Sequence, residues 1–488
     1  MASIEAVDPK DLRIAELERE NAGLKLAVST LVARVQVLES LVQELQARLA
    51  ANSSNSSRPP SSDGPGASPS QKPATPSGLR RGGQPGHPQH QRRLLPPERV
   101  TQTTTLLPPA CRCCGKPLHG RDPAPYQHQV VEIPPLLAQA HDYWLHSLSC
   151  ADCHMATRAA LPAGVPTGCF GPRLQAMIAV CSGQYHLSKR MIEQMMGDFF
   201  DADLALGSVS KLEADTSAAL AAPVAQAAAQ VREQPVQHAD ETGWTEAKQR
   251  AWLWVIVTAQ VAVFLLDRSR GAQVARRLLG EVREGILISD RWSAYNWIPA
   301  GQRQICWAHL IRHCKGFADY GEQARRIGND LLACGKRMFD DWHRVRDGTL
   351  GRADFQHLMG PLRGEIVELL RQGSQCAAPK VAGRCREILK LEGALFTFVR
   401  VAGVEPTNNS AERAIRPAVL WRKGSFGTDS EPGSRFVERI LTVVTTLRLQ
   451  QRHVLDYVTS ACQAHLSGQP APSLLPPGAL VEPSPTVG

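Results

Sequence analysis

A seven-residue leucine repeat near the start of the chain constrains the fold more than any other feature of the sequence. Leucine returns at every seventh position over residues 10–50, and valine stands four residues after three of these leucines. This pattern favours a parallel two-stranded coiled coil. We expect a leucine zipper that pairs two copies of the chain; the alternative is one amphipathic helix packed on its own domain. The repeated leucines are Leu17, Leu24, Leu31, Leu38 and Leu45.

Polar residues of the repeat support pairing. Asn21 stands at a core position of the heptad, where a polar side chain fixes register and strand number at some cost in stability. In a parallel dimer Glu20 would face Lys25, and Arg34 would face Glu39. Both pairs have opposite charges, which favours self-association.

The composition changes sharply after the repeat. Residues 51–104 are rich in Ser, Pro, Gly, Gln and Arg and cannot bury a core, so we expect a disordered basic linker. Such an arm could track phosphates, or it could be an ordinary solubilising linker. The arginines of this arm are Arg80, Arg81, Arg92 and Arg93.

The overall composition limits the class of protein. A chain of 488 residues is too long for one small domain. The net charge of +9 suggests a polyanionic partner. No run of about 18 apolar residues is evident, so a membrane-spanning helix is not expected. The first residues lack a basic region followed by an apolar stretch, so no secretion signal is expected. We expect an intracellular protein of several modules.

Two C-x-x-C pairs mark a small domain at residues 105–160. The 13 cysteines are an odd number in a long chain, which fits a reduced compartment and a metal site better than disulfides. Four thiolates can bind one structural Zn²⁺. A redox pair or coincidence are the alternatives, and Cys113 makes the ligand set less certain. A strand-like stretch, Gln127–Ile133, separates the pairs. The expected ligands are Cys111, Cys114, Cys150 and Cys153.

The remaining sequence predicts an α/β fold. Residues 161–235 have helical spacing, and residues 236–466 begin in the order strand-strand-strand-helix-strand-helix-strand. A helical insertion over about 312–404 and a helix-rich part from 408 follow, and residues 467–488 form a Pro-rich tail that we expect to be disordered. Strands are expected at 236–240, 251–258, 261–267, 285–290 and 303–306, and the helix among them at 272–282.

Two acids end expected strands of this sheet. Asp240 ends the first strand and Asp290 ends the fourth, so their carboxylates should meet at one edge of the sheet. Two such carboxylates repel, and divalent cations relieve the repulsion and can promote phosphoryl transfer. Spacing does not choose a third acid. Taken singly, Asp240 could be a loop acid, Asp290 could cap a helix, and Glu412, three residues after Asn409, resembles a capping box.

Four sequence blocks resemble the insertion sequence 66 family of transposases. The block that begins at Asn408 is the most specific of the four, and the resemblance extends over nearly the whole chain, including the zipper, the linker and the cysteine pairs. The blocks are Asp240-Glu-Thr-Gly-Trp244, Ser289-Asp-Arg-Trp-Ser-Ala-Tyr295, Cys306-Trp-Ala-His309 and Asn408-Asn-Ser-Ala-Glu-Arg-Ala-Ile-Arg-Pro417.

This resemblance implies a ribonuclease-H-like catalytic core with a helical insertion before the third acid. It implies that Asp240, Asp290 and Glu412 bind two Mg²⁺ ions, or Mn²⁺, and that the protein cleaves and joins the ends of its own element. Only the resemblance selects Glu412. It further implies double-stranded DNA as partner, self-association through the zipper, accessory proteins of the element, and a location on the bacterial nucleoid in the cytoplasm.

Basic residues after the third acid are candidate DNA contacts, and so is His309. A solvated basic helix face is the alternative for each of them. Cys306 and His309 alone make no metal site, so we interpret them as positioning residues. The candidate contacts are Arg413, Arg416, Arg422, Lys423 and His309.

The chain departs from the family pattern at two places. Arg291-Trp292 follows the second acid where the family commonly has Gly-Tyr, and Arg422-Lys-Gly stands where it usually has Arg-Lys-Asn. Neither change removes a carboxylate, so both bear on the fit to DNA. Two other functions stay open: a catalytically inactive DNA-binding repressor, and a nuclease of the same fold such as a junction resolvase.

Overall fold

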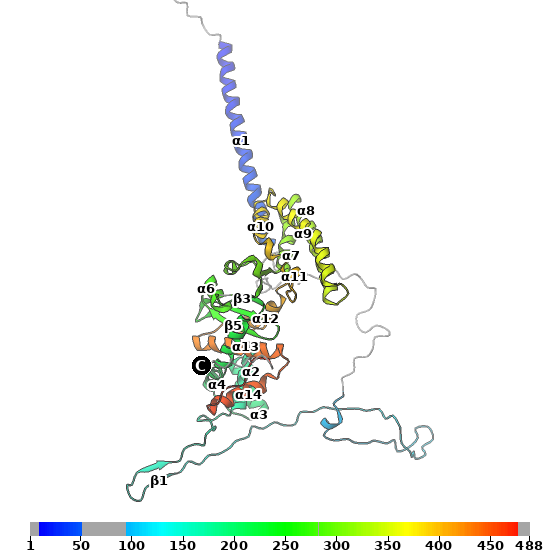
Figure 1. Ribbon diagram of the computed structural model, residues 1–488, viewed down its shortest axis with the longest axis vertical. Coiled ribbons are helices and arrows are strands. Elements are labelled where there is room, and N and C mark those ends of the chain that lie inside the picture. The colour runs from blue at the N-terminus through cyan, green and yellow to red at the C-terminus, as the bar shows by residue number, and fades with distance from the viewer. Residues whose placement is uncertain (1–8, 51–93, 282, 477–488) are drawn as a thin grey trace, which may run out of the picture.

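The computed structural model describes residues 9–50, 94–281 and 283–476 (Figure 1). The expected linker arginines at 80, 81, 92 and 93 lie outside this part of the chain. The described elements form a mixed α/β body from which one long helix projects.

The projecting helix, α1 (Pro9–Ala50), confirms the helical expectation for the leucine repeat. Its leucines are open to solvent, with Leu24 67% and Leu31 58% exposed. An ion pair of 2.7 Å between Glu44 and Lys380 joins the end of α1 to helix α10 (Pro379–Leu389). The part of the chain that the structure describes leaves the leucine seam exposed, and its pairing with a second copy stays a prediction.

The same helix also bears on the membrane expectation. Residues Glu16–Gln46 are long and apolar enough to cross a bilayer by length and composition, with a mean hydropathy of 1.2 and none of the window buried. One such helix near the N-terminus is weak evidence for a membrane span, because a zipper places apolar residues in the same helix.

Residues 94–170 contain little regular structure. A 3₁₀ turn, η2 (Pro97–Arg99), and a short antiparallel hairpin of β1 (Ser147–Ser149) and β2 (Ala156–Arg158) are the regular elements described there. The stretch Gln127–Ile133 is not a strand, contrary to expectation. Instead, the Gln129 side chain binds the backbone of Leu95, accepting from its N–H at 2.8 Å and donating to its carbonyl.

A five-stranded mixed sheet forms the centre of the body, in the order β5-β4-β3-β6-β7. The first three strands pair antiparallel, and β3, β6 and β7 pair parallel. Ala247 and Lys248 join β3 to β4 with positive φ at both positions, as tight hairpins require. The strands are β3 (Val236–Glu246), β4 (Gln249–Val257), β5 (Ala262–Asp267), β6 (Ile286–Ser289) and β7 (Arg303–Ile305).

One connection differs from the expected order. The helix α6 (Ala272–Leu279) precedes β6 as expected, but two 3₁₀ turns, η3 (Ser293–Tyr295) and η4 (Ala300–Gln302), replace the helix expected between β6 and β7. The expected helix is wrong because the loop between these strands is too short for one that also crosses a sheet face. The sequence after β7 supplies the helix instead, as α7 (Trp307–Lys315).

Helices cover both faces of the sheet, and its strands β4, β5 and β6 are mostly apolar. The helices expected as a connector before the sheet are part of this arrangement, because α2, α4 and α5 share one core with Ala239, Trp254 and Ile256 of the sheet. Helix α3 packs on α2 and α4 in a smaller cluster. These helices are α2 (Pro172–Gly183), α3 (Lys189–Phe200), α4 (Leu206–Ala219) and α5 (Ala221–Arg232).

The opposite face of the sheet packs against the helices that follow the insertion, α12 (Asn409–Ser425) and α13 (Glu431–Leu449). Helix α13 also protects the edge strand β5. Side chains one helical turn apart accept hydrogen bonds from alternate N–H groups of that strand. The pairs are Ala262 with Thr446 (3.0 Å), Phe264 with Thr442 (3.0 Å) and Leu266 with Glu438 (2.5 Å).

The insertion between β7 and α12 is helical, as expected, and has its own core, into which Ile288 and Ile305 of the sheet project. In Figure 1 it lies at the end of the body from which α1 projects. Its elements are α7, η5 (Gly316–Tyr320), α8 (Glu322–Arg346), α9 (Arg352–Ser374), α10, η6 (Glu392–Ala394) and α11 (Thr397–Arg400).

The C-terminal part ends with α14 (Val454–Leu466), and the segment after it corrects an expectation. Residues 467–476 belong to the expected disordered tail, but Leu474 is fully buried in the main core. The Tyr457 hydroxyl donates to the carbonyl of Pro472 at 2.8 Å. Burial of one leucine and the backbone hydrogen bonds around it hold this segment in place. Residues 477–488 lie outside the described part.

Candidate functional site

Asp240 lies inside strand β3, not at its end as expected. The β3–β4 hairpin is longer than its apolar part suggests, because Glu241 to Glu246 continue the pairing with β4. Asp240 nevertheless lies beside the segment that follows strand β6. His238 pairs with Ile288 of the parallel strand β6, so Asp240 and Asp290 lie at equivalent positions two residues further on.

The electrostatics of Asp240 indicate that carboxylates gather around it. Burial raises the pKa of this carboxyl well above its usual range, and the negative charges of Glu241, Asp290 and Glu412 raise the pKa further. Its Oδ1 accepts a hydrogen bond of 2.9 Å from the N–H of Glu241, which lowers the pKa and does not offset the repulsion. Like charges this close favour a bound cation.

Asp290 follows β6 directly and is held by its own loop. Its Oδ1 accepts the N–H of Trp292 at 2.8 Å, which orients the carboxylate and leaves its second oxygen free of this turn. Its carbonyl accepts hydrogen bonds from Ser289 Oγ (2.9 Å) and from Arg303 Nη2 (3.2 Å) on the neighbouring strand β7. In the described chain no α-helix begins directly after Asp290 for it to cap, and its side chain is bound by the turn that follows β6.

Glu412 lies in the first turn of α12 and points to residues of α7. Its Oε1 is 3.5 Å from Arg312 Nη2 and 3.6 Å from His309 Nδ1. The capping box proposed for Asn409 and Glu412 is not formed, since Asn408 is the N-cap residue and its side chain makes no capping hydrogen bond. Glu412 is therefore available to the site.

Asn408 is a site residue that sequence reasoning did not single out. It is fully buried, and its Nδ2 donates to the carbonyl of Ala239 at 2.7 Å. Its Oδ1 lies 3.3 Å from Nδ1 of His238, a ring whose pKa burial lowers to about 4, and its N–H donates to Cys306 Sγ at 3.2 Å. Asn408 thus ties strand β3 to the start of α12. Its place in the most specific sequence block was the available signal.

Cys306 and His309 lie beside Glu412. Among the described residues, they form the one group of three or more candidate metal ligands whose donor atoms all lie within 4.8 Å of one another. Burial raises the pKa of the Cys306 thiol to about 11, so it stays protonated, and it accepts the N–H of Asn408. A protonated thiol already used as an acceptor suits a positioning role. His309 lies beside an acid, with 3.6 Å between its Nδ1 and Oε1 of Glu412.

Glu241 is a second residue that the sequence interpretation missed, although it follows Asp240 directly. Its Oε1 accepts from Arg270 Nε (3.0 Å) and Nη2 (2.8 Å), and its Oε2 accepts from the Tyr295 hydroxyl at 2.7 Å. Burial raises the pKa of Glu241 to about 7. Arg270 is itself stacked on Trp292, 3.8 Å from the ring centre. This network contacts the loop that follows Asp290 through Trp292 and Tyr295.

The candidate DNA contacts divide into two groups. Arg413, Arg416 and Lys423 are exposed on α12. Arg422 is instead tied to β3, where its guanidinium donates to the carbonyl of Gly243 and, at 3.2 Å, to Thr242 Oγ1. Two bonds within the chain make Arg422 a structural link between α12 and the strand of Asp240.

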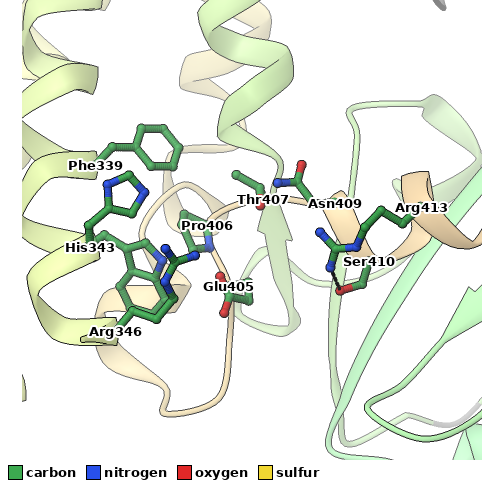
Figure 2. Close-up of a pocket in the computed structure, with 10 residues that line it drawn as sticks. Phe339, His343, Arg346, Glu405, Pro406, Thr407, Asn409, Ser410 and Arg413 are labelled. Carbon is green, nitrogen blue, oxygen red and sulfur yellow. Dashed lines mark hydrogen bonds between the residues drawn. The ribbon is translucent and has the colours of Figure 1, made fainter. Parts of the chain in front are cut away.

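A pocket of about 180 Å³ lies at the start of α12, beside Arg413 (Figure 2). Helix α8 supplies His343 and Arg346 on one side, and α12 supplies Ser410 and Arg413 on the other. Arg413 Nη2 is 3.4 Å from Ser410 Oγ. Glu405 is the acid that lines this pocket, so the surface is basic overall.

The two cysteine pairs have the same local geometry. In the first, the N–H of Gly115 donates to the carbonyl of Cys111 and the N–H of Cys111 to that of Lys116, both at 2.9 Å; in the second, His154, Cys150 and Met155 repeat this pattern at 3.0 Å. Backbone N–H groups lower the pKa of the Cys111 and Cys150 thiols. The two pairs therefore share one turn geometry, and metal binding by them stays a prediction. The described structure does not gather the four thiols at one point.

The acids of the sheet fit divalent cations. Asp240, Asp290 and Glu412 offer hard carboxylate oxygens, and the charges of Asp290 and Glu412 contribute to the raised pKa of Asp240. Within the described structure the three carboxylates do not all lie within 4.8 Å of one another. The thiol of Cys306, a soft and protonated ligand, is a poor partner for Mg²⁺.

Comparisons with known proteins agree with this arrangement. Residues 167–435, more than half of the chain, match the family described as Transposase IS66 family. Residues 6–93 match a family of unknown function. The first match begins just before α2 and ends within α13, so it includes the sheet, the three acids and the insertion.

One curated relative is similar over part of its length. It is the uncharacterized protein y4qI of Sinorhizobium fredii, 26% identical over 245 residues. The aligned segment covers 46% of this chain and 45% of the relative, so each protein extends well beyond what they share.

Proposed function

Because the chain belongs to the IS66 family of transposases, we propose that it binds the terminal inverted repeats of its own element and cleaves and transfers their strands. The observation that carries this proposal is the placement of Asp240 on β3 and Asp290 just after β6 at equivalent positions of neighbouring parallel strands, with Glu412 near enough for its charge to act on Asp240. Family membership gives the class of enzyme, and the three acids give the chemistry.

The strand order supports a ribonuclease-H-like core. Three antiparallel strands followed by two parallel ones, with β3 in the middle, place Asp240 beside Asp290. The helical insertion then returns the chain to the sheet at Asn408, and the charge of Glu412 acts on Asp240. These features support the core that the sequence resemblance implies.

Asp240, Asp290 and Glu412 would hold Mg²⁺ or Mn²⁺. Divalent cations in such a site lower the pKa of an attacking hydroxyl and stabilise the charge on the leaving oxygen. Arg312 and His309 of α7 flank the Glu412 carboxylate. Asn408 links the start of α12 to strand β3. The protein thus orients the acids before DNA arrives.

The proposed reaction has two steps, cleavage and strand transfer. In cleavage, a water oxygen bonds to phosphorus, the bond from phosphorus to the 3′ oxygen breaks, and that oxygen takes a proton to become a 3′-hydroxyl. In strand transfer, this hydroxyl bonds to a phosphorus of target DNA and loses its proton, and a target 3′ oxygen leaves. Exposed Arg413, Arg416 and Lys423 would contact the phosphates of bound DNA.

The other modules would assemble the complex. A coiled coil of α1 would bring two element ends together, since its leucine seam is uncovered in one chain. One Zn²⁺ held by Cys111, Cys114, Cys150 and Cys153 would fold the segment between α1 and the catalytic domain. Accessory proteins of the element remain part of this proposal on the strength of the resemblance alone.

A strand-transfer assay tests the proposal. Purified protein is incubated with Mg²⁺, a labelled duplex carrying the inverted repeat that flanks the coding sequence, and an unlabelled second duplex. The expected product is a labelled end joined to the second duplex. Cutting without joining would favour the junction-resolvase alternative, and binding without cutting would favour the repressor. Either result would overturn the proposed transposase activity.

A further inference from the structure

A groove of about 650 Å³ opens beside Asp290. One wall is the loop from Asp290 to Arg303, which joins β6 to β7, and the other is the end of α10 in the insertion. The groove therefore lies at the boundary between the sheet that carries the acids and the helical insertion. Its charged lining decides what it can bind.

Arg291 lines this groove and has no acidic partner. Its Nη2 lies 2.5 Å from Nδ1 of His313 on α7. Burial, and then the charge of Arg291, lower the pKa of His313 to about 3, so the ring is neutral and accepts this hydrogen bond. Among the described residues no carboxylate forms an ion pair with Arg291. Its guanidinium is held in place by a neutral partner, and the charges of Asp290 and Glu387 act on it without forming an ion pair.

Arg303 adds a second guanidinium that has no ion-pair partner among the described residues. The side chain is 1% exposed, and it donates to Asn296 Oδ1 (3.3 Å), Ser289 Oγ (3.4 Å) and the carbonyl of Asp290 (3.2 Å). Its Nε is buried and has no hydrogen-bond partner. All of these partners are neutral. The charge of Asp290 acts on this buried guanidinium without bonding to it, so a further anion would stabilise it.

The acids of the groove do not cancel these charges. Glu387 pairs with Lys390 on α10, 2.7 Å away, which leaves Asp290 as the remaining carboxylate of the lining. Two guanidiniums therefore face one carboxylate. A phosphodiester is the anion that would come to Asp290 during the proposed reaction, and arginine binds phosphate oxygens through two parallel N–H groups.

We propose that this groove binds a backbone phosphate of the DNA strand next to the scissile bond, with Arg291 as its contact and Arg303 as the buried charge behind it. The inference rests on the proposed function, because it needs DNA at Asp290. It adds a specific subsite that positions the strand between the sheet and the insertion.

Phosphate neutralisation tests this subsite. Binding of the full-length protein to the inverted-repeat duplex is measured by fluorescence anisotropy in Ca²⁺ without Mg²⁺, with single phosphates near the scissile bond replaced in turn by neutral methylphosphonate. For the unaltered protein, one position should weaken binding roughly tenfold. Arg291→Gln should bind the normal duplex about as weakly, lose nothing more at that position, and reduce the salt slope by about 1.

Two control variants separate charge from folding. Arg291→Lys keeps the charge and should keep the salt slope. Arg325→Gln removes an exposed arginine of α8 that pairs with Glu322 at 2.7 Å, outside the groove, and should bind like the unaltered protein. The glutamine variants should both keep the thermal unfolding midpoint of the unaltered protein within a few degrees.

The outcomes are distinguishable. If the unaltered protein binds the duplex but Arg291→Gln binds equally well, or loses affinity equally at every methylphosphonate position, the phosphate subsite is wrong and the proposed function stands. Loss of the salt slope in Arg291→Lys would also overturn the subsite. If the unaltered protein binds no duplex, the proposed function fails first, and this inference fails with it.

Discussion

The side-chain amide of Asn408 donates a hydrogen bond of 2.7 Å to the backbone carbonyl of Ala239. This single bond joins the residue before Asp240 on β3 to the N-cap residue of the helix that carries Glu412. About ninety insertion residues separate the third acid from the sheet in sequence, so a fixed link at this point sets how the acids face one another. It is a contact that holds the end of the insertion and the start of α12 against the sheet.

Replacing Asn408 with Ala should therefore lower both stability and cleavage. The variant leaves the buried carbonyl of Ala239 without its donor, which typically costs about 1–3 kcal/mol. Thermal unfolding measures the loss of stability, and the cleavage rate measured well below the unfolding temperature should fall more than tenfold, roughly, as Glu412 loses its position.

The neighbouring residue supplies the control for this prediction. Asn409 is exposed in the first turn of the same helix, and Asn409→Ala should change the unfolding midpoint little. Equal stability of Asn408→Ala and Asn409→Ala would show that the link to Ala239 contributes nothing.

The sequence predicted the acids better than the strand that carries one of them. Asp240 and Asp290 are neighbours as expected, because each lies two residues beyond the stretch in which β3 and β6 pair in parallel. The hairpin beyond Asp240 was not predicted, because Glu241 to Glu246 are mostly polar and lack the alternation of a strand. Pairing with the strongly apolar β4 overrides their weak preference.

Other features depend on contacts that no local pattern reveals. Asn408 and Ala239 are far apart in sequence, and so are Glu241 and Tyr295. Leu474 lies in a Pro-rich segment that reads as a disordered tail, yet it fills a place in the core. Glu412 could be chosen only by resemblance, since its approach to Arg312 depends on how the insertion folds.

Glu438 should make stability depend on pH. Burial raises its pKa to about 7, although it accepts the N–H of Leu266 and pairs with Arg435 at 2.8 Å. A raised pKa means that the folded state holds the proton more tightly. This stabilising contribution is complete below about pH 4.5, the usual glutamate pKa, and is lost as the pH rises through 7.

Glu438→Gln removes this titration. Between pH 4.5 and pH 8 the variant should gain on the unaltered protein by up to about 3 kcal/mol in the free energy of unfolding. Thermal unfolding midpoints of both proteins, measured across this range, check the prediction. A constant difference between the two midpoints at all pH values would contradict a raised pKa at Glu438.

The cysteine pairs should bind one zinc ion per chain. Metal content measured by plasma mass spectrometry after purification without chelator should fall to near zero in Cys150→Ser, because a tetrahedral site loses affinity with one of its four thiolates. Cys113→Ser is the matched control, since Cys113 is exposed and lies outside the expected ligand set. Equal zinc loss in both variants, or none in either, would contradict the proposed site.

The leucine seam of α1 should hold two chains together. Leu24→Glu with Leu31→Glu places charges in that seam and should shift the sedimenting species from dimer to monomer. Leu26→Glu puts the same charge on an equally exposed leucine outside the seam and should leave the dimer intact. A monomeric unaltered protein, or dissociation by Leu26→Glu, would contradict the coiled coil.

The cleavage reaction of Asp240→Asn tests the central claim most directly. The change keeps the shape of the side chain and removes its charge, so the raised pKa and the attraction for divalent cations disappear together. The measurement is cleavage of a labelled inverted-repeat duplex in Mg²⁺, beside binding of the same duplex in Ca²⁺. The account predicts that cleavage is lost by a factor of roughly 10³ or more while binding stays within a few fold of the unaltered protein. Cleavage at the unaltered rate, with binding intact, would contradict the assignment of Asp240, Asp290 and Glu412 as the catalytic acids.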